Sequence, residues 1–262
     1  MLASTIPQLR SYEPAFAYEM AMIVEEGINE MYGKGKDVFY YMTSHNENYL
    51  HPDLPADAKE QARIRQGVKK GMYLFHNNAD EGEVAKADLF ASGSIMMEAL
   101  KAQNILKEVY NIATNIWSVT SYSELAKEAD AVSRWNNLNP EKPAKVSYLE
   151  RQLDHDRAIV AVSDSIKAVP RQIEHWVKGK FNVLGTDGMG LSDTREKLRD
   201  HFEIGWNHIV YQTLVSLFQK GEFQCDNWDE LRNDLNINPF KRSAVADPLS
   251  IGLEEFLPES DI

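Results

Sequence analysis

The densest group of hydrogen-bonding side chains in the sequence is the run His45–Tyr49, which reads HNENY. It follows Val38–Thr43 (VFYYMT), a short segment rich in β-branched and aromatic residues that predicts a buried strand. Ligands of open parallel sheets bind outside the carboxyl ends of the strands. The run therefore fits a ligand site, and it fits equally well a long loop that is held by its own hydrogen bonds.

Two glycine-containing runs have the composition of an anion-binding loop. Gly185–Gly190 reads GTDGMG and lies between a predicted strand and a predicted helix, where backbone amides can hold a phosphate. The run lacks a lysine followed by serine or threonine, and it lacks the glycine spacing of a dinucleotide site. A tight turn that needs positive φ is the favoured interpretation, both here and at Ser92–Ser94 (SGS).

The spacing of histidine, cysteine and acidic residues does not indicate a metal site or a catalytic nucleophile. None of the seven histidines has another four residues away, so no helix presents two imidazoles on one face. Asp154–Asp156 (DHD) is too short a run to converge on one ion. The sequence has no nucleophile elbow, and acidic neighbours disfavour the thiolate of Cys225. We expect no metal site and no catalytic nucleophile.

Composition excludes several classes of protein. The 262 residues contain 28 lysines and arginines against 40 acidic residues, and the resulting net charge of -12 disfavours binding to nucleic acid. No apolar run reaches the length of a membrane span. Met1–Pro7 lacks the features of a signal peptide, and a single cysteine fits a reducing compartment. We predict a cytoplasmic protein with no membrane partner.

The elements that would position these residues are predicted from periodicity. A helix over Pro14–Tyr32, the strand over Val38–Thr43 and a helix over Ala58–Val68 precede the turn-forming segment His76–Gly82 (HNNADEG), which indicates a domain boundary. Beyond it strands and helices alternate, which implies a mostly parallel sheet with helices on both faces. The predicted strands are 87–91, 116–120, 158–162 and 181–184. Helix starts are predicted at Ser121 with Glu124, at Ser147 with Glu150, and at Asp193 with Glu196. Periodicity is lost after Pro239.

Several long runs, in the same order, resemble one known family. They are SYEPAFAYEMA at Ser11–Ala21, MYGKGKDVFYYMTSHNENY at Met31–Tyr49, KGMYLF at Lys70–Phe75, SVTSYSELA with RWN within Ser118–Asn136, and LGTDGMGLSDTREKLRDHFE at Leu184–Glu203. Together they resemble the homodimeric, transketolase-like, acetyl-transferring pyruvate dehydrogenase decarboxylating component, over about residues 2–218. The resemblance implies an α/β fold in three parts: the carboxyl-terminal part of a thiamine-pyrimidine-binding domain over 1–80, a transketolase C-terminal-like domain over 81–240, and a loose tail over 241–262.

The resemblance also implies a reaction. The family decarboxylates pyruvate on thiamine diphosphate with Mg²⁺ and passes the acetyl unit to lipoyl groups of the partner dihydrolipoyl acetyltransferase. Its GDG…NN cofactor motif does not occur in this sequence, and its activating glutamate and catalytic histidine segment would lie before Met1. We therefore expect the isolated chain to be inactive, to hold neither cofactor nor metal, and to need the missing amino-terminal domains and a homodimer partner.

Analogy with related enzymes places a rim of the substrate channel on this chain. The candidate residues lie at a helix start and at a strand end, and they are Phe16, Tyr18, His45, Asn46, Glu47 and Asn48. Where the family usually reads GFGRSD, this chain has Met189 and Leu191. Two alternatives stay open: a non-catalytic dimerisation or interaction module, and a related 2-oxo acid dehydrogenase or transketolase-type enzyme. An incomplete pyrimidine-binding domain should also expose apolar surface and favour self-association.

Overall fold

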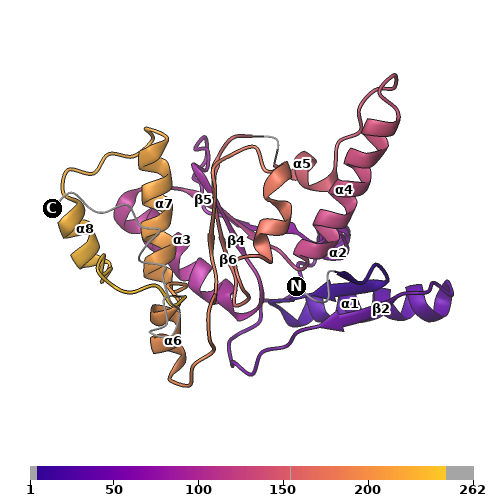
Figure 1. Cartoon of the computed structure of the whole chain (residues 1–262), viewed down its shortest axis with the longest axis horizontal. Helices are drawn as coiled ribbons and strands as arrows, with labels where there is room; N and C mark the ends of the chain where they lie inside the picture. The colour runs from indigo at the N-terminus through magenta and orange to yellow at the C-terminus, as the bar shows by residue number, and fades with distance from the viewer. Residues whose placement is uncertain (1–4, 154, 246–262) are drawn as a thin grey trace.

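A mixed five-stranded sheet forms the centre of the molecule (Figure 1). The computed structural model describes residues 5–153 and 155–245, so the predicted tail over 241–262 lies outside the described residues from 246 onward. The strand order is β3-β5-β4-β6-β7, and β4, β5, β6 and β7 run parallel while β3 is antiparallel to β5. The strands are β3 (Tyr73–Asn77), β4 (Ala87–Ala91), β5 (Thr114–Ser118), β6 (Ala158–Val162) and β7 (Phe181–Leu184). The predicted α/β class with a mostly parallel sheet is confirmed.

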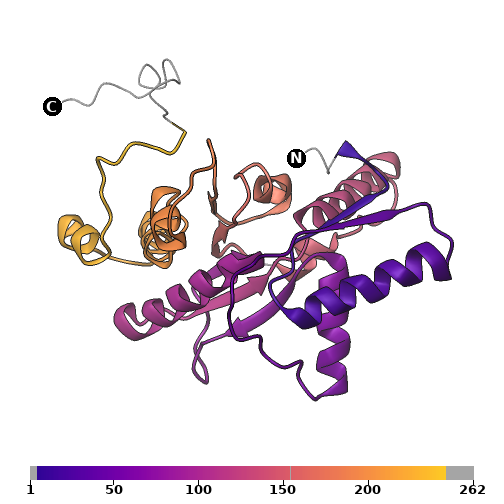
Figure 2. The same cartoon turned by 90° about the horizontal axis from the view of Figure 1, so that it is seen from below.

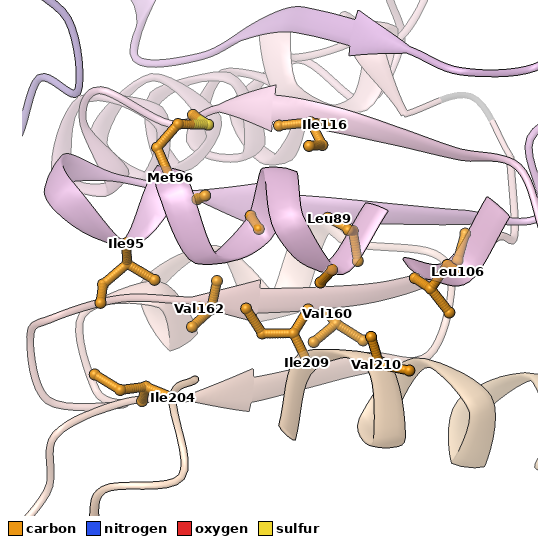
Figure 3. Packing of buried hydrophobic residues seen from close by; sticks show 14 of the residues in the cluster. Leu89, Ile95, Met96, Leu106, Ile116, Val160, Val162, Ile204, Ile209 and Val210 are labelled. Atoms are coloured by element: carbon orange, nitrogen blue, oxygen red, sulfur yellow. The ribbon is translucent and has the colours of Figure 1, made fainter. Parts of the chain in front are cut away.

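Alternate residues of the central strands bury on opposite faces of this sheet. Leu89 and Val160 join one hydrophobic cluster, in which α3 (Met96–Tyr110) and α7 (Trp206–Gln219) cover the sheet (Figure 3). α8 (Trp228–Asp234) adds Leu231 to this cluster and lies beside α7 (Figure 1). Phe90 and Ile159 point the other way, toward α4 (Tyr122–Leu138), α5 (Tyr148–Gln152) and the 3-10 helix Pro170–Trp176. The sheet is therefore covered on both faces, as the alternating pattern predicts.

The amino-terminal part has a small sheet of its own, with two parallel strands and two helices (Figure 2). Its elements are β1 (Leu9–Tyr12), α1 (Ala17–Ile28) with the π-helical turn Asn29–Gly33, β2 (Phe39–Met42) and α2 (Ala58–Lys70). The predicted strand is present, but the prediction that it is buried is wrong. Phe39 is 48% and Tyr41 is 52% exposed, because β2 pairs only with β1 and no helix among the described residues covers its outer face.

The five-stranded sheet includes residues from both sides of the proposed domain boundary. β3 precedes residue 80, yet it pairs with β5, with an irregular register between Leu74 and His76. The division into 1–80 and 81–240 stays a proposal, and its first part contributes one strand to the main sheet.

Local signals place most helix starts correctly. Ser121 and Ser147 each accept a hydrogen bond from the backbone of the glutamate three residues on, as predicted. At α6 (Arg195–His201) the predicted cap Asp193 is wrong by one residue, because Thr194 accepts the bond from Lys197 N. The predicted strand over 116–120 is β5, two residues earlier, and a 3-10 helix, Gly93–Ile95, precedes α3.

Candidate functional site

Four polar side chains converge where strands of the two sheets end. Glu13 follows β1, His45 lies beyond β2, Ser92 follows β4 and Asp164 follows β6. Ser92 Oγ donates to Glu13 Oε2 at 2.8 Å. His45 lies between the two acids, with Nε2 at 4.0 Å from Glu13 Oε1 and Nδ1 at 3.7 Å from Asp164 Oδ2. This is the carboxyl edge of the strands, where parallel sheets bind ligands.

The electrostatics of this cluster depend on burial. Burial raises the pKa of Glu13 to about 7; the negative charge of Asp164 adds to the shift, and the hydrogen bond from Ser92 opposes it. The pKa of Asp164 is also raised by burial, against the attraction of His45. A carboxyl group with a pKa near 7 can accept or donate a proton at neutral pH. The cluster thus combines proton exchange with a histidine whose Nε2 is buried and has no hydrogen-bond partner among the described residues.

A glycine makes room for His45. Gly93 has φ of +52°, and a Cβ placed on it would lie 2.5 Å from His45 Nε2. A side chain at this position would displace the imidazole from its place between the two acids. The SGS run is thus explained by backbone conformation and close packing, as the structural interpretation predicts.

The predicted residues Asn46 and Glu47 are held by α6. Arg195 Nη2 donates to Asn46 Oδ1 at 2.8 Å, and Arg199 Nη2 donates to Glu47 Oε2 at 2.5 Å. Arg199 also bonds Glu98 Oε1 of α3 at 2.9 Å. A cavity of about 190 Å³ is lined by His45, Asn46, Glu47, Asp164, Arg195 and Arg199, among others. Asn48 lies on the same loop and is exposed.

Phe16 and Tyr18 belong to a buried cluster at the start of α1. The Phe16 ring packs 4.8 Å from Phe75 and 5.7 Å from Tyr18, measured between ring centroids. Tyr18 Oη lies 2.6 Å from Tyr73 Oη, which donates to Glu19 Oε1 at 2.7 Å. Phe16 is buried, so any contact with a ligand falls to Tyr18.

The loop after β2 joins both groups of predicted residues. Tyr49 Oη donates to Ala15 O at 2.5 Å, and Ala17 N donates to His51 Nδ1 at 3.1 Å. One loop thus touches the start of α1 at one end and α6 at the other. The structure brings His45, Asn46 and Glu47 together and places Phe16 and Tyr18 beside the same loop.

Sequence reasoning missed two acids of this region. Glu19 is fully buried and accepts hydrogen bonds from Ala15 N, Tyr73 Oη and Ser118 Oγ, and burial raises its pKa. Its position three residues after the N-cap residue Phe16 was an available signal. Glu13 has no such signal, because its burial depends on strands that lie about 80 and 150 residues further along the chain.

Other candidate chemistry is not seen in the described parts of the chain. No group of three or more histidine, cysteine, aspartate or glutamate residues is placed to hold a metal ion. In the GTDGMG run, Asp187 Oδ1 accepts a bond from Lys167 N at 2.8 Å, and Gly188 has φ of +100°, which fits the interpretation as a tight turn. No helix in residues 5–153 or 155–245 is long and apolar enough to cross a membrane.

Two family models match the chain in succession. Residues 1–52 match the middle domain of the pyruvate dehydrogenase E1 component, and residues 71–205 match the transketolase-like C-terminal domain. The chain belongs to the transketolase-like C-terminal domain family. The match covers α3 to α6 and every strand of the main sheet, including β3.

Curated relatives of this transketolase-like chain are pyruvate dehydrogenase E1 components. The one from Pseudomonas aeruginosa is 39% identical over 247 residues, which cover 94% of this chain and 27% of the relative. The one from Escherichia coli is 40% identical over 220 residues, which cover 83% of this chain and 24% of the relative. The chain spans about a quarter of the length of the curated relatives it matches, and the resemblance stated from the sequence is confirmed.

Solved structures agree on the fold. Transketolase from Campylobacter jejuni superposes with a TM-score of 0.56 at 18% identity, over 82% of this chain and 27% of that one. Transketolase from Leishmania mexicana gives 0.55 at 16% identity, over 83% and 26%. At these identities the likeness shows the transketolase-like fold alone.

Proposed function

We propose that the chain supplies the carboxyl-terminal part of a thiamine-diphosphate-dependent pyruvate dehydrogenase E1 component. The observation that carries this proposal is that an E1 middle-domain match is followed by a transketolase-like C-terminal match in this chain, 94% of which aligns with a curated E1 component. In the complete protein, pyruvate loses carbon dioxide and the acetyl unit passes to lipoyl groups of a dihydrolipoyl acetyltransferase. The proposal places this protein in the cytoplasm as a homodimer.

The thiamine diphosphate and Mg²⁺ site belongs, in this proposal, to domains that this chain does not contain. The sequence has no GDG motif, and the described residues do not fit a Mg²⁺ site because no three candidate ligands lie together. Bound thiamine diphosphate would supply the electron sink for decarboxylation. The part assigned to this chain is scaffold, dimer packing and one rim of the substrate channel.

The rim consists of the loop after β2 and the start of α1. His45, Asn46 and Glu47 lie at the carboxyl edge of the strands. Arg195 restrains Asn46 and Arg199 restrains Glu47, while His45 lies 3.7 Å from Asp164. The restraint limits the conformations of Asn46 and Glu47 before a ligand arrives, which lowers the entropic cost of binding. Phe16, Tyr18 and Asn48 complete the proposed rim.

A chimera tests this assignment directly. The matched segment of the Pseudomonas aeruginosa relative is replaced by this chain, and release of carbon dioxide from pyruvate is measured with thiamine diphosphate and Mg²⁺. We expect decarboxylation of pyruvate. A folded, dimeric chimera that prefers 2-oxobutyrate or a sugar phosphate would point to the related-enzyme alternative, and one inactive on all three would point to a non-catalytic module.

Variants of the same chimera test the rim. Glu47→Gln removes the charge that Arg199 holds, and we expect kcat/KM for pyruvate to fall at least roughly ten-fold. Glu25→Gln on the exposed side of α1, where Glu25 is paired with Arg65, is the matched control and should leave kcat/KM unchanged. Equal activity of the two variants would remove Glu47 from the rim.

A further inference from the structure

A second cavity lies between the small sheet and the main sheet. Its volume is about 420 Å³, and its walls come from the ends of β1 and β2, the segment after β5 with the first turn of α4, and the segment after β6. Glu13 and Thr43 line it from one side, and Tyr122, Ser123 and Gln172 from the other. His45, Asn46 and Glu47 line the smaller cavity and not this one. The volume falls within the range of small-molecule sites.

Two hydroxyl groups on its walls are buried without partners. Tyr122 is 3% exposed, and neither its Oη nor Thr43 Oγ1 has a hydrogen-bond partner among the described residues. Buried polar atoms are nearly always hydrogen-bonded, because leaving water without a new partner costs free energy. Thr43 follows β2 of the small sheet and Tyr122 is the first residue of α4, and both residues line the same space, so a molecule in that space can bond both hydroxyl groups.

The start of α4 adds backbone donors to the same wall. Ser121 Oγ accepts from Glu124 N, which satisfies one of the free amides at this helix end. Tyr122 and Ser123 are the first two residues of this 17-residue helix, and both line the cavity. Amides at the first helical positions have no partner within the helix. The wall is therefore rich in donors that suit oxygen atoms of a ligand.

The charges around the cavity disfavour an anion. No lysine or arginine lines it, and its carboxylic acid, Glu13, has a pKa near 7 and is partly ionised at neutral pH. The carboxyl group of Glu13 faces Ser92, His45 and Asp164, and no arginine or lysine among the described residues lies beside it to neutralise its negative charge. A phosphate or carboxylate would be repelled by Glu13 with no cation to compensate. An uncharged ligand with several hydroxyl groups meets the same donors without that cost.

We propose that this cavity binds a small uncharged polyhydroxy compound, a sugar or polyol without phosphate, through Tyr122, Thr43 and the first amides of α4. The site is separate from the proposed channel rim. It does not depend on the proposed function, because its test uses the chain alone and no thiamine chemistry.

The test follows the NMR signals of Tyr122 and Thr43 in the full chain while glycerol, myo-inositol or D-glucose is added, with inorganic phosphate as the charged comparison. A shift in the unfolding midpoint would not show binding, because polyols stabilise proteins without binding to them. The NMR signals of Tyr122 and Thr43 report binding at this cavity. We expect saturable shifts at both residues with at least one neutral probe and none with phosphate. Binding of phosphate in preference to the neutral probes would overturn the ligand class, and no saturable shift with any neutral probe would overturn the site.

Variants separate binding from stability. Tyr122→Phe and Thr43→Val each remove a hydroxyl without a protein partner, so each should weaken binding roughly five-fold while leaving the unfolding midpoint unchanged or higher. The matched control is Tyr148→Phe, since Tyr148 Oη donates to Met72 O at 2.9 Å away from the cavity. This control should lower the unfolding midpoint without changing affinity. Affinity that is unaffected by both cavity variants would overturn the proposal.

Discussion

The buried carboxyl groups of this chain differ in what surrounds them. Asp88 is fully buried in β4, yet its pKa is lowered, because His155, Arg157 and Asn115 oppose the effect of burial. His155 Nε2 lies 3.0 Å and Asn115 Nδ2 lies 2.7 Å from the carboxylate. Glu13 has no arginine or lysine beside it, and its pKa is raised. Partners rather than burial alone decide which acid stays ionised.

The stability of the fold should depend on the protonation of Glu13. Its pKa rises from an ordinary 4.5 to about 7, so the folded state binds the proton more tightly than the unfolded state does. The resulting stabilisation is complete below pH 4.5 and is lost as pH rises to about 7. The free energy of unfolding of the wild type should therefore fall between pH 5 and pH 8. We expect this fall to exceed that of Glu13→Gln by on the order of 3 kcal/mol. Urea unfolding at both pH values measures this difference, and equal pH dependence in the two proteins would refute it.

Among the helices and strands, the sequence predicts those with a periodic hydrophobic pattern. It misses those whose burial depends on contacts with residues far away in the sequence. The strands β4 and β6 and the helices around them bury whole faces, so their patterns are strong. β1 (LRSY) has polar residues in the middle, and β3 is an edge strand with an irregular register, so neither resembles a buried strand. The predicted loop His45–Asn48 lies at the expected edge, but Arg199 and Glu13 reach it only through the tertiary fold.

The junction between α2 and α4 depends on Gly71. It ends α2 with φ of +109°, and a Cβ placed there would lie 2.4 Å from Ser121 O at the start of α4. Gly35 also has positive φ, +62°, but no atom lies within 4 Å of its Cβ position. We expect Gly71→Ala to lower the free energy of unfolding by about 3 kcal/mol and Gly35→Ala by about 1 kcal/mol. Denaturant unfolding of both variants measures the difference in the free energy of unfolding. Because both glycines have positive φ, this difference reports the steric contact with Ser121 O rather than the backbone angle.

The loop after β2 depends on Arg199. Its guanidinium bonds both Glu47 and Glu98, so it ties the loop to α3 through α6. In Arg199→Ala we expect amide hydrogen exchange over residues 44–57 to become roughly ten-fold faster. Arg63→Ala, which removes a pair with Glu60 within α2, is the control and should leave exchange in the loop unchanged. A loop that exchanges at the same rate in both variants would show that other contacts hold it.

At the scale of the whole molecule, the small sheet exposes apolar surface. Phe39 and Tyr41 point to the same side of β2 and are about half exposed. Such a face on a two-stranded sheet favours association. We expect the isolated chain to self-associate in sedimentation experiments, and the double variant Phe39→Ser, Tyr41→Ser to associate roughly ten-fold more weakly. Leu50→Ser, at a residue 95% exposed on the loop, is the control. A wild-type chain that stays monomeric at high concentration would contradict this expectation.

In the proposed function, this chain supports a reaction whose principal groups lie in other domains. The most direct measurement compares the purified chain alone, the amino-terminal remainder of the Pseudomonas aeruginosa relative alone, and the two mixed, each with thiamine diphosphate, Mg²⁺ and pyruvate. We predict that this chain alone neither binds the cofactor nor releases carbon dioxide, and that the mixture releases it faster than the remainder by itself. Cofactor binding and pyruvate turnover by the chain alone would contradict this supporting role.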